Sequence, residues 1–326
     1  MSPADGGINA ALGSARGARD IAGVTSASPA LRPLEPVLVM DRFAPLHAEL
    51  IGLLRRLGPD DWPRPTVCAL WSVRDIVAHL LDDDLRRLSF HRDGQPPPSE
   101  AAAIDGHASL VAFINRMNAE WVGVARRMSP RVLIDLLEVT GPWVEALFRS
   151  IDPSAPAFWS VAWAGEERSA HWFDVGRDYT ERWLHQQQIR DAVGAPPLTA
   201  RDWLHPVLAL FVRALPHAYR DTAAAAGATV HVAIEGPAGG DWTLRREPTG
   251  WELLSGTASS PTARATLSDD SAWRLFSKGL TPDAAAARVR LEGDQALGSV
   301  VLRSLAIMAA PQPATPATSA ATATSV

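Results

Sequence analysis

The stretch Trp71-Ser-Val-Arg-Asp-Ile-Val-Ala-His79 decides the fold, together with Glu181-Arg-Trp-Leu-His185 further along the chain. Both stretches have the residue pattern of a helix. Glu181 and His185 are four residues apart and therefore share one helix face. Two histidines and a carboxylate are the ligand types of an open catalytic site for a divalent metal. His79, Glu181 and His185 are therefore candidate metal ligands on packed helices.

Spacing alone leaves other interpretations open. A Glu and a His four residues apart occur by chance on many helices, where Glu181 would be solvated and His185 a partly buried histidine with ordinary partners. His79 lies on an otherwise apolar face with Ile76 and Leu80. A histidine in that position can equally be a hydrogen-bonded core residue.

Residues 37–194 have a helical pattern throughout. Ser72, with Asp75 three residues later, is a variant of the capping box that starts a helix. Helices joined by loops in this way predict an antiparallel bundle. The segment 149–168 is long enough to form a lid or a pocket rim. The expected helices are 46–54, 72–88, 110–128, 130–148 (broken near Gly141-Pro142) and 169–193, the last ended by Gly194.

Residues 200–309 mix helix and strand. Short alternating segments between glycine-rich turns predict a small antiparallel sheet, which helices cover. The chain as a whole is therefore expected to be α+β. The expected strands are 229–235, 241–246, 251–254, 263–267 and 289–291, and the expected helices are 203–226, 269–276, 282–287 and 294–309.

Composition narrows the class of protein. The 326 residues are 47% hydrophobic and 21% charged, which is typical of a soluble globular protein with room for two domains. The net charge of −5 and the lack of a basic run give no electrostatic case for a nucleic-acid partner, and none is expected. Cys68 is the only cysteine, so a disulfide within the chain and a cysteine-based zinc cluster are excluded. A small buried hydrophobe is favoured over a nucleophile for Cys68.

The two ends differ from the rest of the chain. Residues 1–36 are predicted to be a disordered leader and 311–326 a low-complexity tail, because neither has the large apolar side chains that offset ordering entropy. The leader lacks the features of a secretory signal, and Arg213 interrupts the best apolar stretch, Pro206–Leu215. We therefore expect a cytoplasmic protein with no membrane partner. The abundance of arginine, alanine and proline is typical of a high-GC, actinobacterial genome.

Longer segments around both motifs resemble a known family. The segment Asp60-Asp-Trp-Pro-Arg-Pro-Thr-Val-Cys-Ala-Leu-Trp-Ser-Val-Arg-Asp-Ile-Val-Ala-His79 is similar to the opening signature of the mycothiol-dependent maleylpyruvate isomerases, which are DinB-like metal-binding four-helix bundles. The segment Tyr179-Thr-Glu-Arg-Trp-Leu-His-Gln-Gln-Gln-Ile-Arg-Asp-Ala192 resembles the family's second metal motif. The part that ends Arg290-Leu-Glu-Gly-Asp-Gln-Ala-Leu297 resembles its C-terminal sterol-carrier-like domain.

This resemblance covers residues 37–308. It implies a DinB-like bundle over 37–194 and a sterol-carrier-like α+β domain over 200–309. It also implies that His79, Glu181 and His185 bind a divalent metal, zinc by preference, with mycothiol as the thiol cosubstrate. The chain departs from the family after His185, where Gln-Gln-Gln-Ile-Arg stands in place of an expected aspartate. Maleylpyruvate is therefore not assumed to be the substrate.

Other residues are candidates for binding a cofactor or substrate. Gln188 lies three residues after His185 and could orient a ligand, or be a surface residue. Arg190 could bind a carboxylate, or form a surface salt bridge. Several tryptophans could line an apolar pocket near the rim, or pack the core instead. These are Trp143, Trp159, Trp163, Trp172 and Trp183.

Three functions remain open at this point. The first is a metal-dependent thiol transferase or isomerase, in which the metal binds a small thiol as thiolate that attacks an electrophile. The second is a hydrolase in which the same metal holds hydroxide. The third is a non-catalytic protein whose C-terminal domain binds an apolar ligand.

Overall fold

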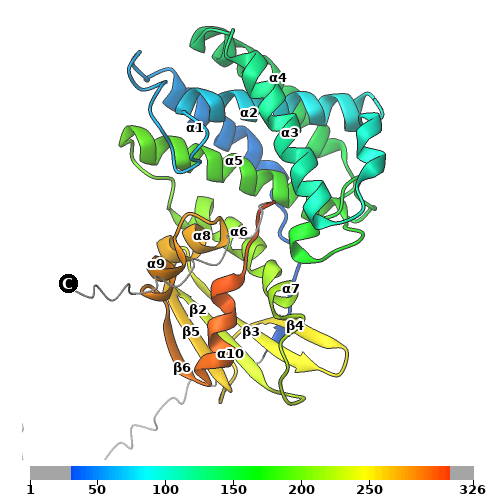
Figure 1. The fold of residues 1–326 in the computed structure, drawn as a ribbon, viewed down its shortest axis with the longest axis vertical. Helices are drawn as coiled ribbons and strands as arrows, with labels where there is room; N and C mark the ends of the chain where they lie inside the picture. The colour runs from blue at the N-terminus through cyan, green and yellow to red at the C-terminus, as the bar shows by residue number, and fades with distance from the viewer. Residues whose placement is uncertain (1–30, 309–326) are drawn as a thin grey trace, which may run out of the picture.

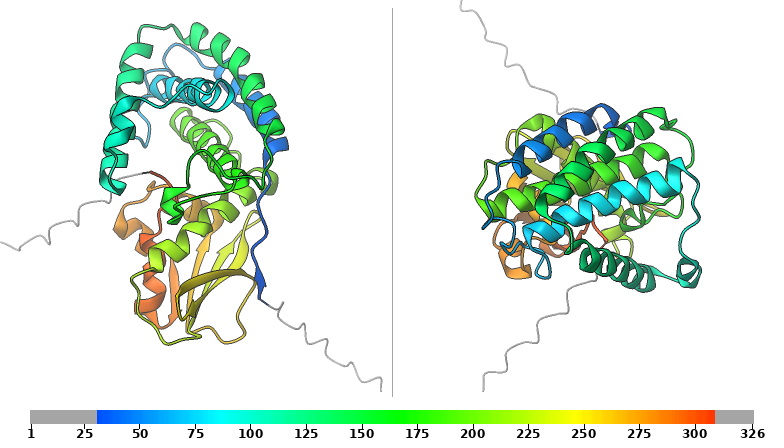
Figure 2. Two further views of the ribbon diagram at one scale, coloured as in Figure 1. Left: turned by 90° about the vertical axis from the view of Figure 1, so that its right-hand side faces the viewer. Right: turned by 90° about the horizontal axis from the view of Figure 1, so that it is seen from above.

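The computed structural model describes residues 31–308. A layer of helices lies on one side of the molecule and a mixed sheet, with helices against it, on the other (Figures 1 and 2). The predicted α+β class is therefore confirmed. The tail predicted over 311–326 and most of the predicted leader lie outside the described residues.

The first part of the described chain is helical. Helices α1, α2, α4 and α5 pack against one another, and α3 lies against α2, where the Trp121 indole donates a hydrogen bond to the Ala78 carbonyl over 2.7 Å. The bounds are α1 Phe43–Leu54, α2 Val73–Arg87, α3 His107–Ala125, α4 Pro130–Ser150 and α5 His171–Val193. Shorter turns of helix are η1 Met40–Arg42, η2 Leu88–Arg92, η3 Ser99–Ala103 and η4 Ala162–Ala164.

The ends of the two helices that carry the motifs are fixed locally, as predicted. The Ser72 hydroxyl accepts from the Asp75 backbone N–H, and the Asp75 carboxylate accepts from the Ser72 backbone N–H, which completes the capping box of α2. Gly194 ends α5 with a φ of 70°, a conformation that glycine adopts without steric cost.

Helix α4 is continuous, so the break predicted near Gly141-Pro142 is wrong. A residue before proline is normally pushed out of the helical region by a clash that involves its Cβ. Gly141 has no Cβ, which relieves that clash. A Cβ there would also lie 2.4 Å from the imidazole of His47 on α1, so glycine allows the close packing of α1 and α4 as well.

The second part contains a six-stranded sheet in the order β1-β4-β3-β2-β5-β6. The sheet is mixed rather than antiparallel, because β5 pairs with β2 in parallel, with Val232 opposite Ala265. The chain returns across the sheet after β4 and adds β5 on the far side of β2, a connection that local alternation does not encode. The bounds are β1 Arg32–Pro33, β2 Thr229–Glu235, β3 Gly240–Glu247, β4 Gly250–Ser255, β5 Ala263–Ser268 and β6 Arg290–Gly293.

The helices of this part are shorter than predicted. The expected helix over 203–226 ends at Tyr219 and is divided near Pro216, and the one over 294–309 ends at Arg303. After Arg303 the Ala306 backbone N–H bonds to the Phe276 carbonyl, which draws the chain away from a helix. The bounds are α6 Arg201–Phe211, η5 Val212–Ala214, α7 Leu215–Tyr219, α8 Asp269–Phe276, α9 Pro282–Ala286, α10 Gln295–Ser299 and η6 Val300–Arg303.

Strand β1 corrects the predicted end of the leader at residue 36. Arg32 pairs with Ser255 and Pro33 with Leu254, so the chain is part of the sheet before it enters the helices. Val39, a few residues later, is buried. The open edge of β4 offers unpaired backbone groups, which an extended segment of almost any composition can satisfy.

One hydrophobic core joins the two parts. Tyr179 and Trp183 of α5 belong to the same buried cluster as Val232 and Leu244 of the sheet. The Trp183 and Trp273 rings meet edge to face, with centroids 5.4 Å apart, across the boundary between α5 and α8. Among the described residues, no helix is both long and apolar enough to cross a membrane.

Candidate metal centre

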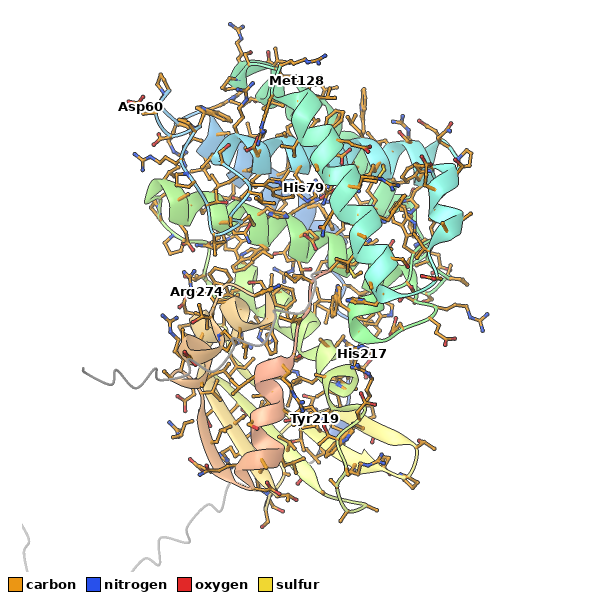
Figure 3. All side chains as sticks on the ribbon, viewed as in Figure 1. Asp60, His79, Met128, His217, Tyr219 and Arg274 are labelled. Carbon is orange, nitrogen blue, oxygen red and sulfur yellow. The ribbon has the colours of Figure 1, made fainter. Side chains whose placement is uncertain are left out.

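His79, Glu181 and His185 come together between α2 and α5. Their ligand atoms all lie within 4.8 Å of one another. The imidazole rings are nearly perpendicular, with centroids 4.8 Å apart. Figure 3 places His79 inside the helical part, and both histidines are buried, whereas the Glu181 side chain is 25% exposed. The three ligand types predicted from spacing therefore form one group with one exposed side.

His79 has a ring nitrogen that no described residue satisfies. Its Nε2 lies 3.6 Å from the Asp83 carboxylate, one helical turn along α2. Its Nδ1 is buried and lacks a hydrogen-bond partner among the described residues. Burial lowers the pKa of His79 to about 4, although Asp83 opposes this effect. At neutral pH the imidazole is therefore uncharged, which is the form that binds metal.

His185 is held by contacts on both ring nitrogens. Its Nδ1 lies 2.8 Å from Oε1 of Gln188, and its Nε2 lies 3.3 Å from the Glu181 carboxylate. Burial opposes protonation of His185, but Glu181 and then Asp83 outweigh it and raise the pKa. Gln188 was predicted to lie on the same helix face as His185, and the structure places it there. Its amide oxygen contacts the ring and orients it.

Two neighbours border the group. The Trp71 ring lies against both imidazoles, with centroids 4.8 Å from His79 and 6.0 Å from His185. The Cys68 thiol donates to Gln188 Oε1 over 3.4 Å. Burial, followed by the charge of Glu181, raises the pKa of Cys68 to about 11. Cys68 is therefore a protonated thiol at neutral pH, and a role as nucleophile is disfavoured.

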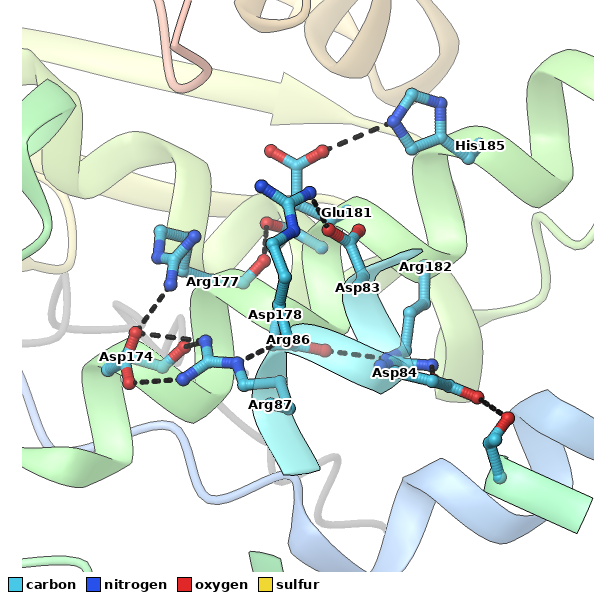
Figure 4. Close-up of polar contacts among 12 residues, drawn as sticks. Asp83, Asp84, Arg86, Arg87, Asp174, Arg177, Asp178, Glu181, Arg182 and His185 are labelled. Carbon is cyan, nitrogen blue, oxygen red and sulfur yellow. Dashed lines mark hydrogen bonds and ion pairs between the residues drawn. The ribbon is translucent and has the colours of Figure 1, made fainter. Parts of the chain in front are cut away.

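Buried ion pairs fasten α2 to α5 next to this group (Figure 4). Arg87 of α2 binds the Asp174 carboxylate with two nitrogens, at 2.7 and 3.0 Å, and binds Asp178 at 2.7 Å. Arg182 of α5 binds Asp178 and Asp84, each at 2.6 Å. Removing one partner of a buried pair of this kind is strongly destabilising, because it leaves a buried charge without compensation. The pairs therefore join the helix that carries His79 to the helix that carries Glu181 and His185.

Comparison with known proteins finds one family model that matches the helical part of the chain. Residues 43–190 match the family model described as "Mycothiol maleylpyruvate isomerase N-terminal domain". The helical part of the chain is therefore similar to the N-terminal domain of this family. The match spans α1 to α5 and so includes His79, Glu181 and His185, the candidate metal site.

Two solved structures are similar to the chain at a low level. Both are of mycothiol-dependent maleylpyruvate isomerase, one of them a histidine-to-alanine mutant. The mutant is 10% identical, with a TM-score of 0.48, and the match covers 79% of this chain and 96% of that one. The other is 10% identical, with a TM-score of 0.45, and the match covers 74% and 91%. No curated protein matches the chain.

Arg190 is not part of the candidate metal site. Its guanidinium donates to the Pro196 carbonyl at 2.7 Å, to Glu49 of α1 at 2.9 Å and to Gln186 at 3.1 Å. Its side chain is only 4% exposed, so it is a buried link between α1 and α5 rather than a surface salt bridge. The structure gives no support to the prediction that Arg190 binds a cofactor.

The predicted tryptophans separate into different environments. Trp163 and Trp183 are buried in the core, Trp172 packs partly buried against it, and Trp143 is half exposed on α4. Trp159 alone among these five lines a large cavity. Three of these five tryptophans therefore pack in or against the core, and only Trp159 lines a pocket as predicted.

Sequence reasoning missed the role of Asp83. The run Asp82-Asp83-Asp84 has the composition of a solvated acidic face, yet Asp84 is fully buried and the other two are largely buried. The available signal was spacing, because Asp83 is four residues after His79 and must lie on the same helix face. Carboxylates that contact the histidine ligands of a metal are a common second layer of such sites.

Proposed function

We propose that this protein is a metal-dependent enzyme that activates a small thiol, mycothiol, toward an electrophilic substrate. The observation that carries the proposal is the convergence of His79, Glu181 and His185 within the isomerase-family domain. Two imidazoles and one carboxylate are a catalytic donor set that leaves a coordination position for a further ligand. Zinc is the metal that this set favours, and other first-row metals suit it as well.

The residues fit a divalent metal. The orphaned Nδ1 of His79 is a buried nitrogen that a cation would satisfy. Gln188 contacts the Nδ1 of His185, and the Nε2 of the same ring faces Glu181. In this orientation His185 and Glu181 can bind the same ion. When bound there, the metal would supply the positive charge that keeps a thiol in its thiolate form at neutral pH.

The surrounding residues prepare the site for this chemistry. The Trp71 ring covers one side of both imidazoles and shields that side from water. Glu181 is partly exposed, which leaves a side from which the thiol can approach. The ion pairs of Arg87 and Arg182 join the ligand-bearing helices. The thiol then either adds to the substrate and leaves again, as in an isomerase, or stays attached, as in a transferase.

Substitution of the ligands tests the proposal. His79→Ala and His185→Ala should each abolish retention of metal, measured by elemental analysis of the purified protein, and thiol-dependent turnover should be lost with it. His107→Ala is the matched control, because His107 is exposed at the start of α3 and outside the group. This control should keep both properties.

Two results would contradict the proposal. Full turnover in metal-stripped protein would exclude a role for the metal. Turnover of the same electrophile at the same rate without mycothiol would favour the alternative in which the metal activates water, and would exclude a thiol-dependent enzyme.

A further inference from the structure

Helix α4 carries large apolar side chains on two faces. One face, which includes Leu133 and Leu137, is buried in the helical part of the molecule. The other face is open to solvent in the part of the chain that the structure describes. It holds four side chains that are each between 38% and 50% exposed, and we call them the α4 stripe: Val132, Leu136, Val139 and Trp143. Single exposed apolar residues are normal on a protein surface, but a row of them marks a site of interaction.

The spacing of the α4 stripe is that of a helix that packs against another helix. Its members follow one another in steps of four, three and four residues, which is the spacing of the core positions in a coiled coil. Ala146 and Ser150, both exposed, continue the row in further steps of three and four. Figures 1 and 2 place α4 on the side of the helical layer that faces away from the sheet. The row therefore lies on an outer surface of the molecule.

The row matches a second copy of itself when the two helices run antiparallel. From Val132 to Ser150 its steps are 4-3-4-3-4, a series that reads the same in both directions. In the antiparallel register, Trp143 lies opposite Val139 of the second copy, and Leu136 lies opposite Ala146 of the second copy. Large side chains therefore meet smaller ones, which is the condition for close packing between two helices.

Charge favours the same arrangement. Asp135 and Arg149 are two heptads apart and so flank the row on one side. The antiparallel register brings Asp135 within about 3 Å of Arg149 of the second copy along the helix axis, and the twofold axis repeats this pair. Both side chains are accessible, with 61% and 48% of their surface exposed. A parallel register would place Trp143 opposite Trp143 and would lose both charge pairs.

We propose that the α4 stripe binds the α4 stripe of a second copy of this chain, in an antiparallel pair with twofold symmetry. A contact of this kind uses the same surface on both copies and closes on itself as a dimer. Trp143 is its main anchor, because large aromatic side chains contribute most of the binding energy at interfaces. The contact between two single helices is small, so the dimer is a weak one. The proposal is independent of the proposed function, since α4 supplies none of the three candidate metal ligands.

Sedimentation velocity of the full-length protein tests the proposal. Between about 1 and 100 μM, the range in which a weak dimer forms, we expect the monomer to give way to a species of twice its mass. Trp143→Ala should raise the dissociation constant roughly 30-fold or more, because it removes the anchor. The Trp143 side chain is half exposed, so its loss should leave the melting temperature of the monomer almost unchanged.

Two valines of equal exposure provide a matched pair of variants. Val139 on α4 is 49% exposed, and Val124 on α3 is 50% exposed. Val139→Glu places a charge in the middle of the row and should leave only monomer over the same concentrations. Val124→Glu changes the same residue type outside the row and should keep the dissociation constant within twofold. Circular dichroism shows whether each variant is folded.

A charge swap tests the direction of the helices. Asp135→Arg should weaken the dimer, because the new side chain meets Arg149 of the second copy. Arg149→Glu in the same chain replaces this repulsion by attraction and should restore most of the affinity. In a parallel dimer these two positions lie far apart, and the second change would restore nothing.

Three outcomes would overturn the proposal. The first is a wild-type protein that stays monomeric at every concentration. The second is a dimer that folded Val139→Glu leaves intact, or that Val124→Glu disrupts to the same extent. The third is a double variant that dimerises no better than Asp135→Arg alone, which would exclude the antiparallel pair.

Discussion

At the scale of single residues, the two histidines of the candidate metal site are equally buried but have opposite pKa shifts. Burial lowers the pKa of His79 to about 4, while Glu181 and Asp83 overcome the same burial at His185 and raise its pKa. His79 is therefore ready to bind a cation over the whole neutral range. The raised pKa of His185 favours the protonated ring there, and a proton competes with a metal ion for the ring nitrogen.

We expect the Gln188 amide to increase metal affinity by orienting the His185 ring. Gln188→Leu removes the acceptor 2.8 Å from His185 Nδ1 and leaves a side chain of similar size. Loss of such an orienting partner typically weakens metal affinity by about 10–100-fold, and we expect that loss in a competition titration with a chelator. Gln188→Glu keeps an acceptor oxygen and should restore most of the affinity. An unchanged affinity in a folded Gln188→Leu protein would exclude the orienting role.

Asp82 is expected to make stability depend on pH. Burial raises its pKa from 3.8 to about 6, so the folded state binds its proton more tightly than the unfolded state. The free energy of unfolding therefore rises as pH falls from about 6 to 4. Above pH 7, the buried ionised carboxylate lowers the free energy of unfolding by at most about 2–3 kcal/mol. Asp82→Asn should therefore be more stable than wild type at pH 8 but not at pH 4.

Denaturant unfolding across this pH range measures the Asp82 effect as a difference between variant and wild type. Asp135→Asn is the control, because Asp135 on α4 has a side chain that is 61% exposed. A difference that does not vary between pH 4 and pH 8 would show that Asp82 is not the titrating group.

At the scale of helices and strands, the sequence predicted what local contacts determine. The start of α2 and the end of α5 follow from Ser72, Asp75 and Gly194, whose capping hydrogen bonds and backbone angles involve only near neighbours. Helix α4 continues through Gly141-Pro142 because Gly141 has no Cβ to clash with the proline, whereas the usual rule for a residue before proline pointed to a break. The parallel pairing of β5 with β2 was likewise missed, because both strand orientations share the same alternation.

Two helix glycines offer a matched test of the packing between α1 and α4. Gly141→Ala places a methyl group 2.4 Å from the His47 ring and should destabilise the protein by about 1–3 kcal/mol. Gly123→Ala on α3 meets no atom within 4 Å and should stabilise it by roughly 0.5–1 kcal/mol through helix propensity. Urea unfolding of each variant and of the wild type would measure these changes in the free energy of unfolding. Equal effects at the two positions would mean that α1 and α4 do not pack this closely.

At the scale of the whole molecule, the convergence of His79, Glu181 and His185 was predictable and the surroundings of these residues were not. His79, Glu181 and His185 lie in two motifs whose spacing and family resemblance are visible in the sequence. The cavity that Trp159 lines is not visible in this way, because Arg86, Phe113 and Trp159 reach it from separate elements. The buried pairs between α2 and α5 also depend on tertiary packing, since Arg87 and Asp174 have no local pattern that joins them.

The shared core predicts that the two parts unfold together. Trp183 of α5 packs on Trp273 of α8, and the buried cluster runs from the helices into the sheet without a break. Separation near residue 195 would expose this apolar surface to water, at about 25 cal/mol per Å². We expect a single transition in which tryptophan fluorescence and far-ultraviolet circular dichroism coincide, and a fragment of residues 37–194 that lacks a cooperative transition of its own. Two separate transitions, or a fragment that melts as sharply as the full chain, would show that the helical part is an independent folding unit despite the common core.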